Sequence, residues 1–100
     1  MTQVQSLSDL EIQRALGKLP GWSRRGGQLT KTYRLKSFPA AIAFVSRVAD
    51  AAERMNHHPD IDIRYTKVTF ALSTHDAGGI TQKDLALAAE IEDASGEAGK

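Results

Sequence analysis

The order in which two hydrophobic periods alternate along the chain is the feature that most constrains its fold. Residues 61–65 and 67–72 alternate apolar and polar side chains, which is typical of strands with one buried face. Residues 38–55 instead repeat apolar side chains at steps of three and four, which is the period of a helix. Short paired strands combined with one-sided helices favour an antiparallel sheet that is covered on one face.

Two further strands are predicted at residues 22–25 and 28–35, ahead of the long helix. Gly26 and Gly27 stand between them, and a Gly-Gly pair favours a two-residue hairpin turn because both residues accept positive φ angles. The sequence therefore predicts one hairpin on each side of the central helix.

The first two helices are predicted from caps and apolar spacing. Ser8 caps a helix through Leu19, with an apolar face of Leu10, Ile12, Leu16 and Leu19. Ser37 caps the long helix, which should end near Asn56 because Pro59 disfavours helical geometry at the residue before it. The expected buried face of the long helix consists of Phe38, Ile42, Val45, Val48, Ala49, Ala52 and Met55.

A third helix is predicted after the loop at residues 76–79. Thr81 and Asp84 have the spacing of a capping box, and the helix should end at about Asp93. Residues 1–6 and 95–100 are expected to be flexible ends of one domain that spans residues 1–100. The predicted fold class is α+β: a four-stranded antiparallel sheet with three helices on one face, in the order α-β-β-α-β-β-α.

Composition argues against several classes of function. Thirteen basic residues balance twelve acidic ones, for a net charge of +1, so no electrostatic capture of nucleic acid or of an anionic membrane is expected. The chain has no cysteine, which excludes disulfides and thiolate chemistry. The longest apolar run, Ala40 to Val45, is far shorter than a membrane span, and a cytoplasmic location is expected.

The candidate chemistry lies in three histidines. His57 and His58 fall where the long helix should break, and His75 falls at the end of the last strand. Free imidazole has a pKa of about 6.5, so two imidazoles facing one pocket suit a reaction that gives one proton and removes another. Glu53, one turn before His57, and Asp84, in the first turn of the last helix, are placed to reach the same pocket.

Simpler interpretations of these residues exist. Histidine near a helix C-terminus is favoured by the helix dipole, whatever its function. Histidine is also a common zinc ligand, but adjacent histidines rarely bind one ion and the chain lacks cysteine, so no metal site is expected. Glu53 and Asp84 could equally be a solvated helix residue and a helix-start carboxylate.

The ordered set of motifs resembles the pterin-4a-carbinolamine dehydratase family over nearly the whole chain. The residues that carry the resemblance are Pro20-Gly21-Trp22, Glu53-x-x-x-His57-His58-Pro59, Tyr65-x-Lys67-Val68, Ser73-Thr74-His75-Asp76 and Gly79-Ile80-Thr81-x-x-Asp84. The resemblance implies dehydration of 4a-hydroxytetrahydropterin to quinonoid dihydropterin, with no metal or organic cofactor. It also implies a place in recycling the pterin used by aromatic amino-acid hydroxylases.

Residue by residue, the resemblance implies that His57 and His75 are the acid–base pair and that His58 belongs to the same catalytic group. His58 and Pro59 would form a wall against the substrate, and the loop of Thr74, His75, Asp76 and Ala77 would bind the pterin ring. Glu53 and Asp84 match acidic positions that support the site. Some relatives have tryptophan where this chain has Ile61, so we expect substrate affinity to differ.

A second function is also implied by the resemblance, because family members can act as dimerisation partners of a transcription factor. A binding module of this kind would use the exposed sheet face or the long helix and would not need the histidines. A homodimer or homotetramer is expected in either case, since a domain of 100 residues buries a modest core.

Overall fold

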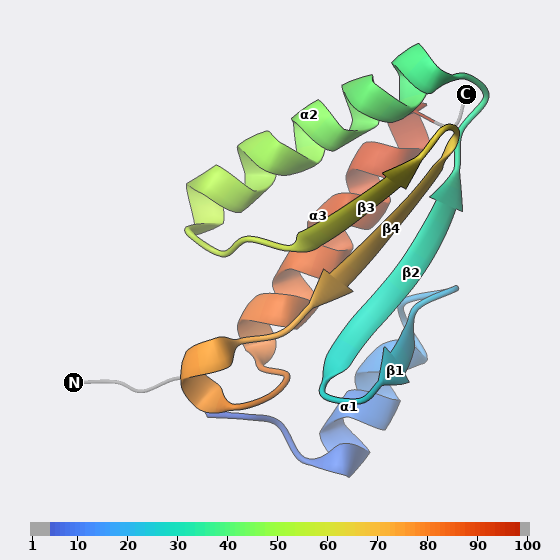
Figure 1. Cartoon of the computed structure of the whole chain (residues 1–100). Helices are drawn as coiled ribbons and strands as arrows, with labels where there is room; N and C mark the ends of the chain where they lie inside the picture. Colours follow the sequence, from blue (N-terminus) through green and yellow to red (C-terminus); the bar gives the residue numbers. More distant parts are fainter. Residues whose placement is uncertain (1–4, 99–100) are drawn as a thin grey trace.

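Within residues 5–98, which the computed structural model describes, one antiparallel sheet of four strands carries three helices on one face (Figure 1). The strands stand in the spatial order β1-β2-β4-β3 and are β1 (Ser23–Arg25), β2 (Gln28–Arg34), β3 (Asp60–Arg64) and β4 (Lys67–Leu72). The helices are α1 (Asp9–Leu16), α2 (Phe38–Met55), the short 3-10 helix η1 (His75–Ala77) and α3 (Gln82–Ala98). The predicted fold class and element order are confirmed.

The local signals for turns and caps act as predicted. The Ser8 hydroxyl accepts from the Glu11 N–H at 3.2 Å, and the Glu11 carboxylate accepts from the Ser8 N–H at 2.9 Å, which is a complete capping box. Ser37 caps α2 by accepting from the Ala40 N–H at 3.1 Å. Gly26 has a φ of 58° in the turn between β1 and β2, which glycine adopts without strain.

The buried face of α2 differs from the predicted one. Phe38 and Ile42 are 46% and 40% exposed, and Ala49 is exposed as well. Val48 and Ala52 are buried as predicted, and Val45 and Met55 are partly buried, but the other buried residues are Ala41, Phe44 and Ala51. Residues 40–45 are apolar on every side of the helix, so periodicity alone could not decide which side faces the sheet.

The ends of the other two long helices also differ from expectation. α1 ends at Leu16, three residues before the predicted end, because Gly17 caps it; Leu10 is exposed while Ile12 is buried. α3 continues to Ala98, five residues beyond the predicted end at Asp93. Of the termini expected to be flexible, residues 1–4 and 99–100 lie outside the described part of the chain.

A carboxylate on α3 joins this helix to the sheet. Glu92 Oε1 accepts hydrogen bonds from the Trp22 indole N–H at 3.3 Å, the Lys31 ammonium and the Tyr33 hydroxyl. The second half of α3 is thereby joined to β2 and to the loop before β1. Ser95 adds a bond from its hydroxyl to the Glu92 carbonyl at 2.7 Å.

These contacts change the acidity of both partners. Burial alone would raise the pKa of Glu92, but the hydrogen bonds from Lys31 and Tyr33 and the charge of Lys31 outweigh it, so the pKa lies below its ordinary value. Burial, and then the hydrogen bond to Glu92, raise the pKa of the Tyr33 phenol.

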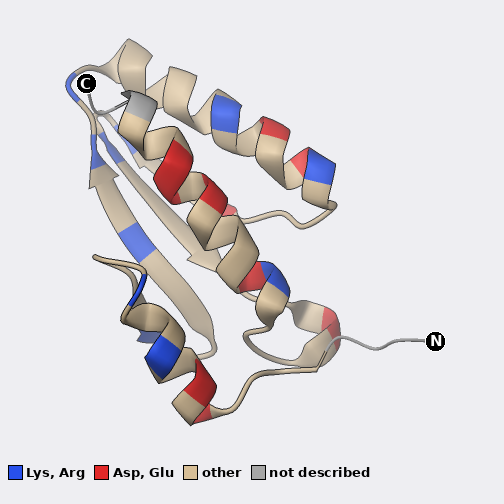
Figure 2. Cartoon of the chain, turned by 180° about the vertical axis from the view of Figure 1, so that it is seen from behind, with Lys and Arg blue, Asp and Glu red and all other residues tan. Residues whose placement is uncertain are grey.

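The surface carries both signs of charge. Figure 2 shows Lys and Arg together with Asp and Glu on each of the three helices. The face of the sheet away from the helices is polar, and Thr32 and Thr69 share a hydrogen bond of 2.8 Å across β2 and β4. No helix in the described residues has the length and apolar character required to span a membrane.

Apolar side chains are exposed at one edge of the sheet. β3 is an edge strand, and Ile61 and Ile63 are exposed on it. Phe38, at the start of α2, stacks on Tyr65 with ring centroids 6.4 Å apart, and Ile42 is exposed one turn further along α2. We call Phe38, Ile42, Ile61, Ile63 and Tyr65 the edge patch.

Candidate active site

The end of α2, the end of β4 with η1, and the start of α3 meet on one side of the molecule (Figure 1). Between them lies a hollow of about 360 Å³, which is within the range of small-molecule sites. It is lined by Asn56, His57, His58, Ser73, Thr74, His75, Asp76 and Lys83. All three histidines therefore face one hollow, as the sequence analysis expected.

The end of α2 places His57. Asn56 adopts a left-handed conformation with a φ of 51°, and the His57 N–H closes the helix on the Ala52 carbonyl at 3.0 Å. The His57 ring then points to the start of α3, where its Nε2 lies 2.6 Å from Asp84 Oδ1. The His57 side chain is 11% exposed and that of Asp84 is fully buried.

Two threonines hold the other oxygen of Asp84. The Thr74 hydroxyl and the Thr81 N–H each donate to Asp84 Oδ2 at 2.9 Å. The hydroxyls of Thr74 and Thr81 lie 2.8 Å apart, and Thr81 Oγ1 accepts from the Lys83 N–H. The predicted capping box is therefore present in part: Asp84 bonds back to the Thr81 backbone, while the Thr81 hydroxyl caps Lys83 rather than Asp84.

His58 has a different setting. Its Nε2 lies 2.6 Å from Glu53 Oε1, but both side chains are more than half exposed, at 57% and 77%. Water screens such a pair strongly, so this contact fixes the His58 ring much less firmly than Asp84 fixes His57.

His75 begins η1, is exposed, and lines the hollow together with His57 and His58. The loop that carries it is closed by the Thr74 N–H bond to the Gly79 carbonyl at 2.8 Å, and Gly78 takes a φ of 71° to allow the turn. A second hollow of about 290 Å³, lined partly by Gln28 and Gly27, lies on the other side of His75 and shares Ser73 and Thr74 with the first.

The predicted site residues fall into three groups. Thr74 and Asp76 line the hollow with the histidines; Asp84 lies behind His57, and Glu53 reaches the hollow only through His58. Pro59, Ala77 and Ile61 are not among the lining residues. Sequence reasoning missed Asn56, Ser73 and Lys83; a left-handed cap and a lysine in a helix's first turn give no chemical signal by themselves.

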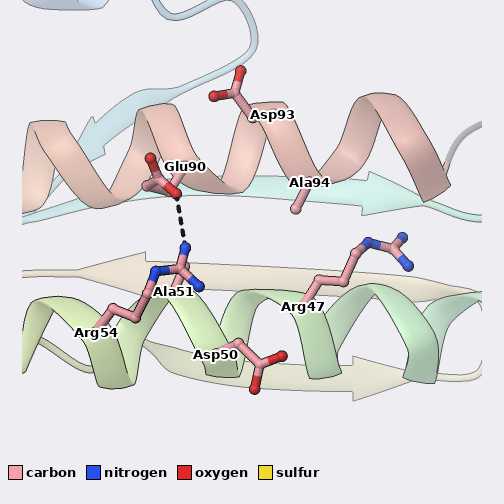
Figure 3. A pocket seen from close by; sticks show the side chains of 7 residues that line it. All are labelled: Arg47, Asp50, Ala51, Arg54, Glu90, Asp93 and Ala94. Atoms are coloured by element: carbon pink, nitrogen blue, oxygen red, sulfur yellow. Dashed lines mark hydrogen bonds and ion pairs between the residues drawn. The ribbon is translucent and has the colours of Figure 1, made fainter.

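Another groove lies between α2 and α3, away from the histidines (Figure 3). It has a volume of about 250 Å³ and is lined by charged side chains of both signs, with Arg54 and Glu90 3.4 Å apart across it. It contains no histidine, so it offers no group that exchanges protons readily near neutral pH. No cluster of three or more metal-ligating side chains is found within residues 5–98.

The family model for pterin 4 alpha carbinolamine dehydratase matches residues 5–94. The chain belongs to this family. A relative from Roseiflexus sp. (strain RS-1), provisionally named a pterin-4-alpha-carbinolamine dehydratase, is 60% identical over 87 residues, covering 87% of this chain and 94% of the relative. A relative from Nocardia farcinica (strain IFM 10152) with the same provisional name is 58% identical over 87 residues, covering 87% of this chain and 92% of its own.

Solved structures show the same dehydratase-family fold. The crystal structure of a transcriptional coactivator/pterin dehydratase from Brucella melitensis has a TM-score of 0.88 and 29% identity, covering 90% of this chain and 98% of its own. A pterin dehydratase-like RuBisCO assembly factor of the alpha-carboxysome has a TM-score of 0.66 and 25% identity, covering 76% and 90%. The fold thus occurs in proteins described by more than one function.

Proposed function

We propose that this protein dehydrates 4a-hydroxytetrahydropterin to quinonoid dihydropterin. The observation that carries the proposal is that His57, His58 and His75 line one hollow and that a buried carboxylate holds His57. Membership of the dehydratase family supports the substrate class.

The reaction asks for two proton transfers. The C4a–O bond breaks, the proton leaves N5, the C4a=N5 double bond forms, and the departing hydroxyl takes a proton to become water. One imidazole accepts the N5 proton and another protonates the hydroxyl. We assign these two transfers to His57 and His75, which line the hollow from different segments of the chain. No electron is transferred, so the proposal requires no redox cofactor.

We assign the remaining site residues to substrate binding. His58, supported by Glu53, and Asp76 form polar walls of the hollow. Pro59 directly follows His58 and Ala77 ends η1, so both lie next to these walls along the chain. Recycling of pterin for aromatic amino-acid hydroxylases, in the cytoplasm, is part of the proposal and rests on the family resemblance.

A stopped-flow assay tests the activity directly. With 4a-hydroxytetrahydropterin as substrate, the protein is expected to accelerate dehydration, since positioned acid–base groups contribute about 10²–10⁴-fold. Dehydration that is no faster with the protein than in buffer alone would refute the proposed function.

The rate should also depend on pH. Histidine side chains in general exchange their protons near neutral pH, and the two proposed roles need opposite protonation states. We therefore expect kcat/KM to rise and fall between pH 5 and pH 9. A flat profile over this range would count against acid–base work by the histidines.

The second candidate function is a binding module, and the exposed edge patch favours it. The Brucella melitensis protein is described both as a transcriptional coactivator and as a pterin dehydratase, so the two functions need not exclude each other. If the protein acts only as a binding module, replacing His57 and His75 leaves its function unchanged.

We also infer that the protein self-associates through β3. Antiparallel pairing of two copies of this strand about Asp62 places Asp60 opposite Arg64 and Ile61 opposite Ile63, so both charges and apolar groups match. Light scattering at micromolar concentration is expected to give the mass of at least two chains, and I63K should lower it. A mass of one chain for the unchanged protein would contradict this inference.

A further inference from the structure

We propose that Nδ1 is the reactive nitrogen of His57, and that Asp84, Thr74 and Thr81 are positioning residues that fix this tautomer. The inference rests on the proposed function and extends it to one atom. It follows from the direction of each hydrogen bond in the buried network behind His57.

The direction of the bonds can be assigned one by one. The Thr81 N–H is always a donor, and the Thr74 hydroxyl gives its one hydrogen to the same oxygen, Asp84 Oδ2. Since Thr74 has no second hydrogen, the Thr81 hydroxyl donates to Thr74. The Lys83 N–H in turn donates to Thr81 Oγ1, so every oxygen in this chain of bonds has its donor.

Asp84 Oδ2 therefore accepts two hydrogen bonds, one from the Thr74 hydroxyl and one from the Thr81 N–H. Its other oxygen, Oδ1, faces only His57 Nε2 among the described residues, at 2.6 Å. A fully buried carboxylate needs a donor at this oxygen, because an unsatisfied buried charge is costly. Neutral His57 thus carries its proton on Nε2, and Nδ1 carries the lone pair.

This tautomer gives His57 a defined role. Nδ1 makes no hydrogen bond within the described residues, so it is the nitrogen left for a bound molecule in the hollow. It accepts the N5 proton as the C4a=N5 bond forms, and Asp84 stabilises the imidazolium that results. The proton taken up by the departing hydroxyl comes from His75, so the reaction balances.

Asp84→Asn tests the assignment. The Thr81 N–H and the Thr74 hydroxyl require the amide oxygen at the Oδ2 position, which turns the amide NH₂ toward His57 Nε2. Nε2 must then accept, and the proton moves to Nδ1. Nitrogen NMR of the imidazoles is expected to show Nε2–H in the unchanged protein and Nδ1–H in the variant. The rate should fall by about 10²–10⁴-fold, which is the contribution of a positioned acid–base group that the wrong tautomer removes.

Two variants of Thr74 provide the second test. Thr74→Val removes the hydroxyl that donates to Asp84, whereas Thr74→Ser keeps it. The valine variant is expected to lose about tenfold in kcat, and the serine variant should recover most of the rate, because only serine keeps a hydroxyl that donates to Asp84 Oδ2. Equal rates for the two variants would overturn the positioning role.

The NMR result separates this inference from the proposed function. Neutral His57 with its proton on Nδ1 in the unchanged protein, or a tautomer unaltered by Asp84→Asn, overturns the inference even if the protein is an active dehydratase. If His57 has the Nε2–H tautomer but the protein has no dehydratase activity, the proposed function and the catalytic role of Nδ1 are wrong. The positioning of the His57 ring by Asp84 then still holds.

Discussion

Replacing both His57 and His75 by alanine is expected to reduce pterin dehydration to its rate in buffer. The two side chains line the same hollow and are the groups assigned to removing and giving the proton. Because acid–base groups that act together are strongly non-additive, each single variant should already lose most of the activity. Stopped-flow measurement of the dehydration rate at pH 7 checks this.

The matched control is Arg54→Ala in the groove between α2 and α3. Arg54 is exposed, pairs only at 3.4 Å with Glu90, and lies outside the hollow. Its removal should leave the rate unchanged. Near-normal activity in the double histidine variant, with both variants folded by circular dichroism, would show that the histidines do not carry the reaction.

Replacing Glu92 by alanine is expected to produce a large loss of stability. The substitution leaves the Trp22 indole, the Tyr33 hydroxyl and the Lys31 ammonium without their shared acceptor. Breaking a partly buried set of this kind costs about 2–4 kcal/mol. Each kcal/mol lowers the Tm of a domain of this size by about 4–8 °C, which thermal denaturation measures.

Glu90→Ala on the same helix is the control, since its exposed pair with Arg54 contributes about 0–1 kcal/mol.

The pH dependence of the stability follows from the lowered pKa of Glu92. A carboxyl whose pKa is lower in the folded state stabilises above its unfolded pKa, and that stability is lost as pH falls through the folded value. Glu92→Gln should therefore flatten the loss of stability below pH 4.5, the ordinary pKa of a glutamate. If the unchanged protein and the Glu92→Gln variant lost the same amount of stability at low pH, this explanation would be wrong.

The parts of the fold that depend on local chemistry could be predicted from the sequence. Ser8 and Ser37 cap their helices and Gly26 forms its turn because each acts on backbone within three or four residues. The buried side of α2 and the length of α3 could not be predicted in this way. They depend on contacts between distant segments, such as Glu92 with Lys31 and Tyr33.

The candidate site shows the same division. Residue type and spacing indicated His57, His58 and His75, but not which carboxylate meets which imidazole. In the structure, Glu53 pairs with His58 at the surface, while Asp84 holds His57 from the interior. The threonine bonds behind Asp84 link the two ends of the segment between β4 and α3 to the first turn of α3, and Thr81 gave no sign from the sequence beyond a helix cap.

The most direct measurement is a crystal structure of the protein soaked with a stable dihydropterin. We expect the pterin ring in the hollow lined by His57 and His75, with a ring nitrogen within hydrogen-bond distance of His57 Nδ1. A pterin bound in the groove between α2 and α3, or elsewhere with the histidine hollow left open, would contradict it.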